Sequence, residues 1–270
     1  MDSYGEILFL GKCNCQCFYC LSNEMRKLKE ESENQISLHF DHWPNFDTFI
    51  TQLKERKINK IFLSSVVAEP MMYKHLKELV EYLSSIGFRV GVRTNGYFFL
   101  EKIDAIKIME EEISISINSL NHDVNHAICG VRELPDYDSI FNELHKLNKS
   151  CRVSIVVNKF NKNEISHILD YISTKKCISY VQLRKIYKYD KQISQDDMDS
   201  FEYIKNELRT NHELIGNYYE SQIFNHQGLQ VSLWEDVFKR SSIQSVNYFT
   251  NGLISTNTLL IPAYEKGEVT

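Results

Sequence analysis

The chain has 270 residues, of which 43% are hydrophobic, so it is long enough for one large domain with a substantial core. Its formal net charge of −5 and its pI of about 6.0 argue against a protein that binds nucleic acid over a broad basic surface. No apolar run approaches the length of a membrane span, and the first residues lack the basic and apolar regions of a signal peptide. We therefore expect a cytoplasmic protein without a membrane partner, whose cysteines are ligands or core residues rather than disulfides.

Short apolar runs alternate along the chain with patterns of helical periodicity. The strand-like runs are residues 7–10, 61–67, 88–93, 113–117, 152–157 and 180–186. The helical patterns are residues 46–55, 72–85, 139–147, 164–172 and 197–208. Strands that alternate with helices indicate a parallel sheet with right-handed crossovers. Six such units predict an α/β fold, an incomplete (β/α)6 barrel.

Two segments interrupt this alternation. Residues 23–40 are polar and poorly periodic, and we interpret them as an excursion on the surface. From about residue 210 the remaining sequence mixes aromatic and polar residues, punctuated by glycines. We predict that residues 1–209 form the partial barrel and that residues 210–270 are a short C-terminal extension that closes its open side.

Four of the seven cysteines lie in residues 11–20, directly after the first predicted strand, and we call this segment the cysteine loop. Cys13, Cys17 and Cys20 have the spacing C-x3-C-x2-C, and Tyr19 precedes the last of them. Soft thiolate ligands suit Fe–S clusters, so three cysteines can hold three irons of a [4Fe–4S] cluster. The fourth iron would then be open to a small molecule.

Cys15 leaves a second interpretation open. With Cys15 included, the loop offers four thiolates, which is the number of ligands in a tetrahedral zinc site. Zinc ligands normally come as pairs from two separated knuckles, whereas these four lie within eight residues. The spacing therefore favours an Fe–S cluster, and a non-enzymatic binding module stabilised by zinc is the alternative.

The cysteine loop resembles that of the radical S-adenosylmethionine (SAM) superfamily. The resemblance implies that Cys13, Cys17 and Cys20 ligate a [4Fe–4S] cluster, while Tyr19 packs near the adenine of SAM. It also implies that SAM chelates the open iron and that an external donor of the flavodoxin or ferredoxin type reduces the cluster. SAM is then cleaved to a 5′-deoxyadenosyl radical, which abstracts hydrogen from the substrate. Cys15 lies outside the family pattern.

Residues after the second strand match another family segment. The chemistry of α/β barrels lies at the C-terminal ends of the strands. There, Glu69-Pro70 resembles the end of a Gly-Gly-Glu-Pro segment that holds the amino group of SAM, although Val67 and Ala68 replace the glycines. A carboxylate facing an ammonium is a charge-assisted contact. Alternatively, Glu69 only begins a helix, where an acidic residue followed by proline is favoured.

Polar residues also stand near the ends of the later strands. Asn95, in a Thr-Asn-Gly sequence, resembles the end of the family's third strand, and Ser116 and Asn118 match its ribose-contacting residues. The resemblance implies that all three residues contact SAM. Asn158 is the matching polar residue after the fifth strand. Arg184 on the sixth strand could hold a carboxylate of SAM or substrate, or could form an ion pair facing the helices.

Features beyond the motif limit the substrate. Cys129, Cys151 and Cys177 are isolated, and we interpret them as small buried hydrophobic residues. For Cys129, in a predicted loop after the fourth strand, the alternative is a thiol that faces the pocket and donates a hydrogen atom. A compact chain without cysteines for auxiliary clusters favours a small-molecule substrate, such as a nucleoside, sugar or amino-acid derivative. The sequence also faintly resembles radical SAM proteins of nucleoside-type natural-product biosynthesis. The alternative is a radical SAM enzyme that acts on a peptide or protein partner.

Overall fold

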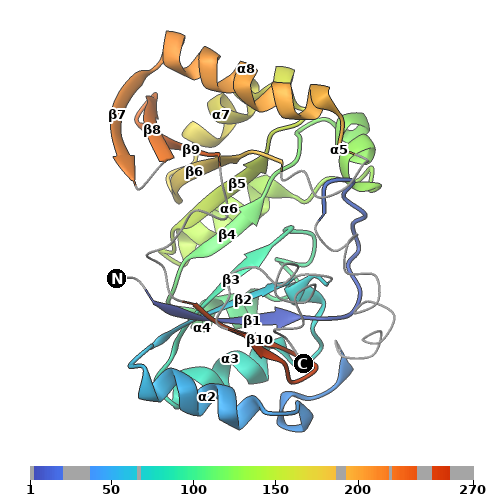
Figure 1. The fold of residues 1–270 in the computed structure, drawn as a ribbon, viewed down its shortest axis with the longest axis vertical. Coiled ribbons are helices and arrows are strands. Elements are labelled where there is room, and N and C mark those ends of the chain that lie inside the picture. The colour runs from blue at the N-terminus through green and yellow to red at the C-terminus, as the bar shows by residue number, and fades with distance from the viewer. Residues whose placement is uncertain are drawn as a thin grey trace.

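The computed structural model describes residues 3–20, 37–65, 68–186, 193–218, 221–235 and 245–255. Within these residues, eleven strands form one sheet in the order β11-β10-β1-β2-β3-β4-β5-β6-β9-β8-β7. Every neighbouring pair from β10 to β9 in this order is parallel, and the strands beyond them pair antiparallel. Figure 1 shows a curved, open sheet, with α2 and α3 near one end and α7 and α8 near the other.

The elements follow the chain in regular alternation as far as β6. The strands are β1 (Tyr4–Phe9), β2 (Lys60–Ser65), β3 (Arg89–Thr94), β4 (Ile113–Ser116), β5 (Cys151–Val156), β6 (Ile178–Arg184), β7 (Glu213–Tyr218), β8 (Ser221–His226), β9 (Leu229–Trp234), β10 (Ser245–Phe249) and β11 (Ile254–Ser255). The α-helices are α2 (Phe46–Glu55), α3 (Leu76–Ser85), α4 (Ile103–Ile108), α5 (His122–Cys129), α6 (Tyr137–Lys146), α7 (Ile165–Ser173) and α8 (Gln195–Asn211). Short 3-10 helices are η3 (Phe40–His42), η4 (Pro70–Met72) and η5 (Lys162–Glu164).

The main core lies between the sheet and the helices that pack on it. Helix α2 buries Phe46, Phe49, Ile50 and Leu53, which share one face at helical spacing. A Cβ atom on Gly5 of β1 would lie 2.7 Å from a methyl group of Leu53, so the helix lies directly against this strand. Glycine at this position therefore permits the close approach.

The sheet also has charged side chains that are paired within the fold. The Arg93 guanidinium contacts the Glu6 carboxylate and lies over the ring of Phe62, 5.1 Å from its centroid. Arg152 donates from Nε to the hydroxyl of Ser114 at 3.1 Å and forms an ion pair with a neighbouring carboxylate. These two guanidinium groups thus have carboxylate partners inside the fold, as buried charges require.

The structure confirms the predicted α/β class with a parallel, barrel-like sheet, and β1–β6 are its six predicted strands. The predicted helix over residues 72–85 is in fact divided, because η4 precedes the start of α3 at Leu76. Helix α5 was not predicted. It has only eight residues, and the residues that cap it determine where it begins and ends. The Asn121 side chain accepts hydrogen bonds at its start, and Gly130 ends it with φ of 75°.

The described residues after position 210 add strands to both ends of the parallel core. β9 pairs with β6 and is followed outward by β8 and β7, whereas β10 pairs with β1 on the opposite side. One sheet therefore continues across residue 209, and the division of the chain at that point stays a prediction. The excursion predicted over residues 23–40 lies mostly outside the described residues. No helix within them is long and apolar enough to span a membrane.

Candidate functional site

The cysteine loop follows β1 and docks on the C-terminal end of α5. The backbone N–H of Gln16 donates to the carbonyl of Cys129 at 2.8 Å, and that of Phe18 donates to the carbonyl of Ile128 at 3.1 Å. The last carbonyls of a helix have no partner within the helix. The loop therefore satisfies the end of α5, and α5 fixes the middle of the loop.

Five thiols gather at this junction. Cys13 is exposed, Cys15, Cys17 and Cys20 are half-buried, and Cys129 is buried. The thiol of Cys129 hydrogen-bonds with those of Cys15 and Cys17. Cys129 is therefore buried, as the sequence predicted, and in addition contacts the cysteine loop.

The donor set of the loop fits a [4Fe–4S] cluster. Across the described residues, no group of three or more His, Cys, Asp or Glu side chains is arranged to hold a metal ion. Cys13, Cys17 and Cys20 would each bind a different iron, so their sulfurs need not converge on one point. All three are thiols on one short segment with at least partial access to solvent.

Hydrogen bonds shift the thiol pKa values of the loop in opposite directions. The pKa of Cys13 is lowered, chiefly because the Cys15 thiol hydrogen-bonds to it. The pKa of Cys17 is raised, chiefly by its hydrogen bond with Cys129. Because the thiolate is the metal-binding form, Cys17 has to release its proton when a metal binds.

Glu69 connects the segments that follow β1, β2 and β3. Glu69 as a residue is 3% exposed, and its carboxylate accepts hydrogen bonds from Met71 N at 3.1 Å, Thr94 Oγ1 at 2.5 Å and Asn95 N at 2.9 Å. Its own backbone N–H donates to the carbonyl of Lys12 at 3.2 Å. Burial raises the pKa of Glu69 to about 7, although the three hydrogen bonds act in the opposite direction. Glu69 thus caps η4, as one of its two interpretations predicted.

Asn95 points at the cysteine loop. Its Nδ2 donates to Asn14 Oδ1 at 2.8 Å, and its Oδ1 accepts from Tyr97 N at 3.2 Å. Gly96 follows with φ of 87°, a conformation that glycine adopts without a steric cost. The Thr-Asn-Gly sequence therefore builds a turn that presents the Asn95 amide to the loop.

Tyr19 and Asn118 meet in the structure. The Tyr19 hydroxyl donates to Asn118 Oδ1 at 2.6 Å, which joins the cysteine loop to the segment after β4. Asn161 Nδ2 donates to the backbone carbonyl of Asn118 at 2.9 Å and so fixes the backbone of this residue. Ser116 is half-buried at the end of β4, in register with Ser154 of β5.

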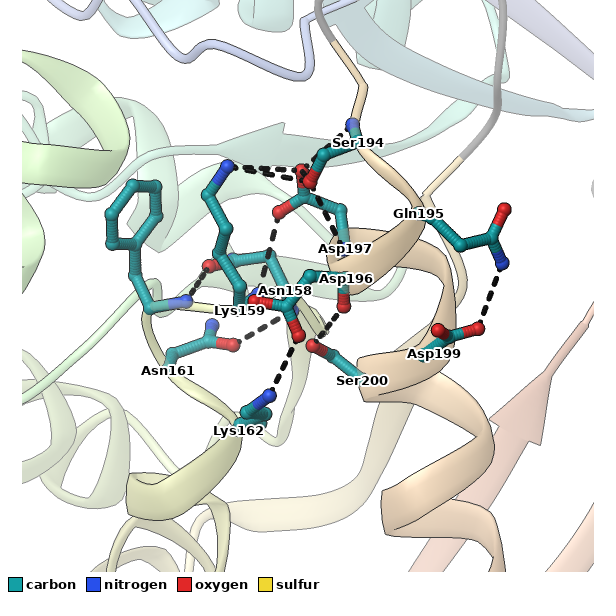
Figure 2. Close-up of polar contacts among 11 residues, drawn as sticks. Asn158, Lys159, Asn161, Lys162, Ser194, Gln195, Asp196, Asp197, Asp199 and Ser200 are labelled. Carbon is teal, nitrogen blue, oxygen red and sulfur yellow. Dashed lines mark hydrogen bonds and ion pairs between the residues drawn. The ribbon is translucent and has the colours of Figure 1, made fainter.

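Asn158 shapes the turn after β5. It is fully buried, and its side chain donates to the carbonyl of Val156 at 3.0 Å and accepts from Phe160 N at 2.9 Å. The neighbouring Lys159 extends toward the start of α8, where Nζ lies 3.4 Å from Asp197 Oδ2 (Figure 2). These contacts fasten the end of β5 to α8, and a contact of Asn158 with SAM stays a prediction.

Arg184 ends β6 at the same edge of the sheet. It is half-buried and lies in register between Val156 of β5 and Trp234 of β9. Its contact with a carboxylate of SAM or substrate stays a prediction.

Sequence reasoning missed several residues that position the site. Thr94 bonds to Glu69, Asn14 bonds to Asn95, and Asn161 holds Asn118. The Thr-Asn-Gly sequence could have pointed to Thr94, but the other contacts join segments far apart in the chain. Val67 lies outside the described residues, whereas the neighbouring Ala68 is buried.

Comparison with known sequences identifies related proteins. The model of the Radical SAM superfamily matches residues 7–172. The GTP 3′,8-cyclase of Campylobacter fetus subsp. fetus is 23% identical over 191 residues, covering 65% of this chain and 55% of that protein. A putative glycyl-radical enzyme activating enzyme of Methanocaldococcus jannaschii is 21% identical over 164 residues, covering 60% of each. The chain therefore spans less than two thirds of either relative.

Solved structures share the fold. SuiB of Streptococcus suis bound to S-adenosylmethionine has a TM-score of 0.64 and 13% identity, covering 95% of this chain and 61% of that one. Native anSMEcpe with bound AdoMet has a TM-score of 0.56 and 10% identity, covering 95% of this chain and 75% of that one. At these identities the likeness concerns the fold alone.

Proposed function

Because this chain belongs to the radical SAM superfamily, we propose that it is an enzyme in which cluster-bound SAM supplies a 5′-deoxyadenosyl radical for hydrogen abstraction from a small molecule. Members of this superfamily use a [4Fe–4S] cluster and SAM, so the predicted family and cofactors are confirmed at that level. The membership also favours the Fe–S cluster over the zinc-stabilised binding module.

The observation that carries the proposal is the placement of the cysteine loop. Cys13, Cys17 and Cys20 lie on a segment after β1, at the edge where the carboxyl ends of the parallel strands meet. In this proposal they are the three cluster ligands, while Cys15 hydrogen-bonds with Cys129 and is not a ligand. The protein's own part is to hold the reactants in place and to exclude water from them.

Other residues of this edge would contact SAM. Tyr19 and Asn118 are already joined by a hydrogen bond, which supports a shared role toward the adenine and ribose. Ser116 lies two residues before Asn118, beside that pair in sequence. The Glu69 carboxylate accepts three hydrogen bonds within the protein. A carboxylate has about four lone-pair sites, so one site remains for an ammonium group.

The remaining polar residues of the predicted site lie at the ends of β5 and β6. Arg184 at the end of β6 offers a guanidinium for a carboxylate of SAM or substrate. Asn158 supports this region through the turn after β5. We assign the reduction step to an external one-electron donor of the flavodoxin or ferredoxin type.

We place a nucleoside-type compound first among the small-molecule substrates, with sugar and amino-acid derivatives after it. The support is the match to a protein named for its action on GTP, which covers 65% of this chain. A peptide or protein partner is the second candidate, because the other curated relative is named as a putative activating enzyme of a glycyl-radical enzyme.

The proposal is tested by anaerobic reconstitution of the full chain with iron and sulfide, followed by dithionite and SAM. We expect 5′-deoxyadenosine, detected by chromatography, and faster formation when the correct substrate is added from a panel of nucleosides, sugars and amino acids. Replacing Cys13, Cys17 and Cys20 together by alanine is expected to abolish the cluster and the cleavage. Cys15→Ala is the matched control and should retain both; loss of the cluster in this variant would contradict the ligand assignment.

A further inference from the structure

The side chain of Asn95 contacts the cysteine loop. Its Nδ2 lies 2.8 Å from Asn14 Oδ1, 3.5 Å from Cys15 Sγ and 3.7 Å from Cys13 Sγ. An amide nitrogen carries two hydrogens. One is directed at Asn14, and the other faces the two sulfurs.

The orientation of this amide is determined by its other contacts. Its Oδ1 accepts from Tyr97 N at 3.2 Å, so the nitrogen, and not the oxygen, must face the loop. The backbone N–H of Asn95 donates to Glu69 Oε2 at 2.9 Å, and Thr94 donates to the same carboxylate at 2.5 Å. The donor and acceptor atoms of the side chain are therefore all engaged within the protein.

We infer that Asn95 is a positioning residue for the cysteine loop, and that its N–H donation to Cys13 raises the reduction potential of the cluster. Reduction adds negative charge to the cluster and its thiolates, and a hydrogen-bond donor stabilises that charge. Glu69 provides the rigid support, since it fixes the backbone of Asn95 and, through its own N–H, the carbonyl of Lys12. The cysteine loop and the Asn95 donor are thus both held by the buried Glu69.

This inference rests on the proposed function, because it takes Cys13 as a cluster ligand. Loss of one hydrogen bond to a charged group is expected to change the equilibrium constant for reduction on the order of tenfold. For a one-electron couple, tenfold corresponds to about 59 mV. Asn95→Ala removes the donor, and Asn95→Asp replaces it with an acceptor of similar shape, so both potentials should fall, with the larger fall in the second variant.

The test is a redox titration of the reconstituted full chain, followed by electron paramagnetic resonance, together with iron content and thermal melting of the cluster-free protein. Asn225→Asp is the matched control. It makes the same change of charge near the end of β8, where Asn225 Oδ1 accepts from Gly228 N at 2.8 Å. A midpoint potential about 59 mV lower in N95D than in N225D would support the inference.

Equal potentials in N95D and N225D would overturn the inference. If N95D takes up no iron but its cluster-free form melts at the wild-type temperature, the positioning role is supported, because only the loop has been affected. The same failure with a lowered melting temperature would overturn it, since Asn95 would then support the fold as a whole. Absence of a cluster in the wild type would instead contradict the proposed function.

Discussion

The buried carboxyl group of Glu69 should make the stability of the fold depend on pH. Burial raises its pKa from 4.5 to about 7, despite the hydrogen bonds from Thr94, Asn95 and Met71. One pKa unit corresponds to about 1.36 kcal/mol, so the ionised group costs the folded state about 3 kcal/mol relative to the unfolded chain. Below pH 4.5 the group is protonated in both states, and this cost is absent. The cost develops as the pH rises from 4.5 to about 7, because only the unfolded state then releases its proton.

Glu69→Gln removes the ionisation and isolates this effect. We expect the free energy of unfolding of the wild type, minus that of the variant, to fall by about 3 kcal/mol between pH 4.5 and pH 7.5. Urea denaturation of the cluster-free chain under reducing conditions, followed by circular dichroism, measures both curves. Thr94→Val removes a hydrogen bond that lowers the pKa of Glu69. In this variant the free energy of unfolding should therefore continue to fall to a higher pH than in the wild type. If the free energies of unfolding of the wild type and E69Q change in parallel across this pH range, the reasoning is refuted.

Two further predictions concern other parts of the fold. A Cβ on Gly91 would lie 2.5 Å from the backbone oxygen of Glu112, so Gly91→Ala should cost about 1–3 kcal/mol in urea denaturation. Gly216→Ala is its control, because no atom lies within 4 Å of the added carbon, and an equal loss in both would contradict the steric argument. Burial and His226 lower the pKa of His212, so stability should fall as the pH drops through 6.5, where the unfolded state takes up the proton first. His212→Gln should flatten the stability curve in this range, and an unchanged slope would show that other groups cause it.

The sequence predicted the fold well where the signal is local. Apolar residues at helical spacing, such as Leu76, Leu79 and Leu83, identify α3 because each helix has to bury one face on the sheet. The strand-end rule likewise predicted that Glu69 and Asn95 would lie near the cysteine loop. It did not predict which atoms they would contact, because those contacts join segments far apart in the chain.

The site therefore contains residues whose type was recognised but whose partners were not. The contact of Asn95 with SAM stays a prediction, and the contacts of its side chain with Asn14 and the loop sulfurs were not foreseen. Cys129 was expected to be a buried hydrophobic residue, and it is buried, but its thiol also meets those of Cys15 and Cys17. No spacing in the sequence relates α5 to the cysteine loop, since the fold alone brings them together.

The cysteine loop takes its conformation from its neighbours. Glu69, Asn95, Asn118 and the end of α5 each hold a different part of it, and none of its described residues belongs to a helix or strand. Fixing one residue costs about 1–2 kcal/mol of backbone entropy, whereas one hydrogen bond returns about 0.5–1.5 kcal/mol. The anchors together therefore offset only part of the cost of ordering the ten residues of the loop, and metal ligation has to supply the remainder.

This balance predicts that losing one anchor affects metal uptake more than the fold. Asn118→Ala removes the acceptor of the Tyr19 hydroxyl, and we expect it to reduce iron bound at limiting iron several-fold, because about 1 kcal/mol is a factor of five or more. Its cluster-free form should melt within a few degrees of the wild type, since the core beneath β4 is unchanged. Iron analysis and thermal melting measure the two effects on the same preparation. A large fall in melting temperature with full iron uptake would contradict this. It would mean that the loop is an integral part of the core and is ordered before the metal binds.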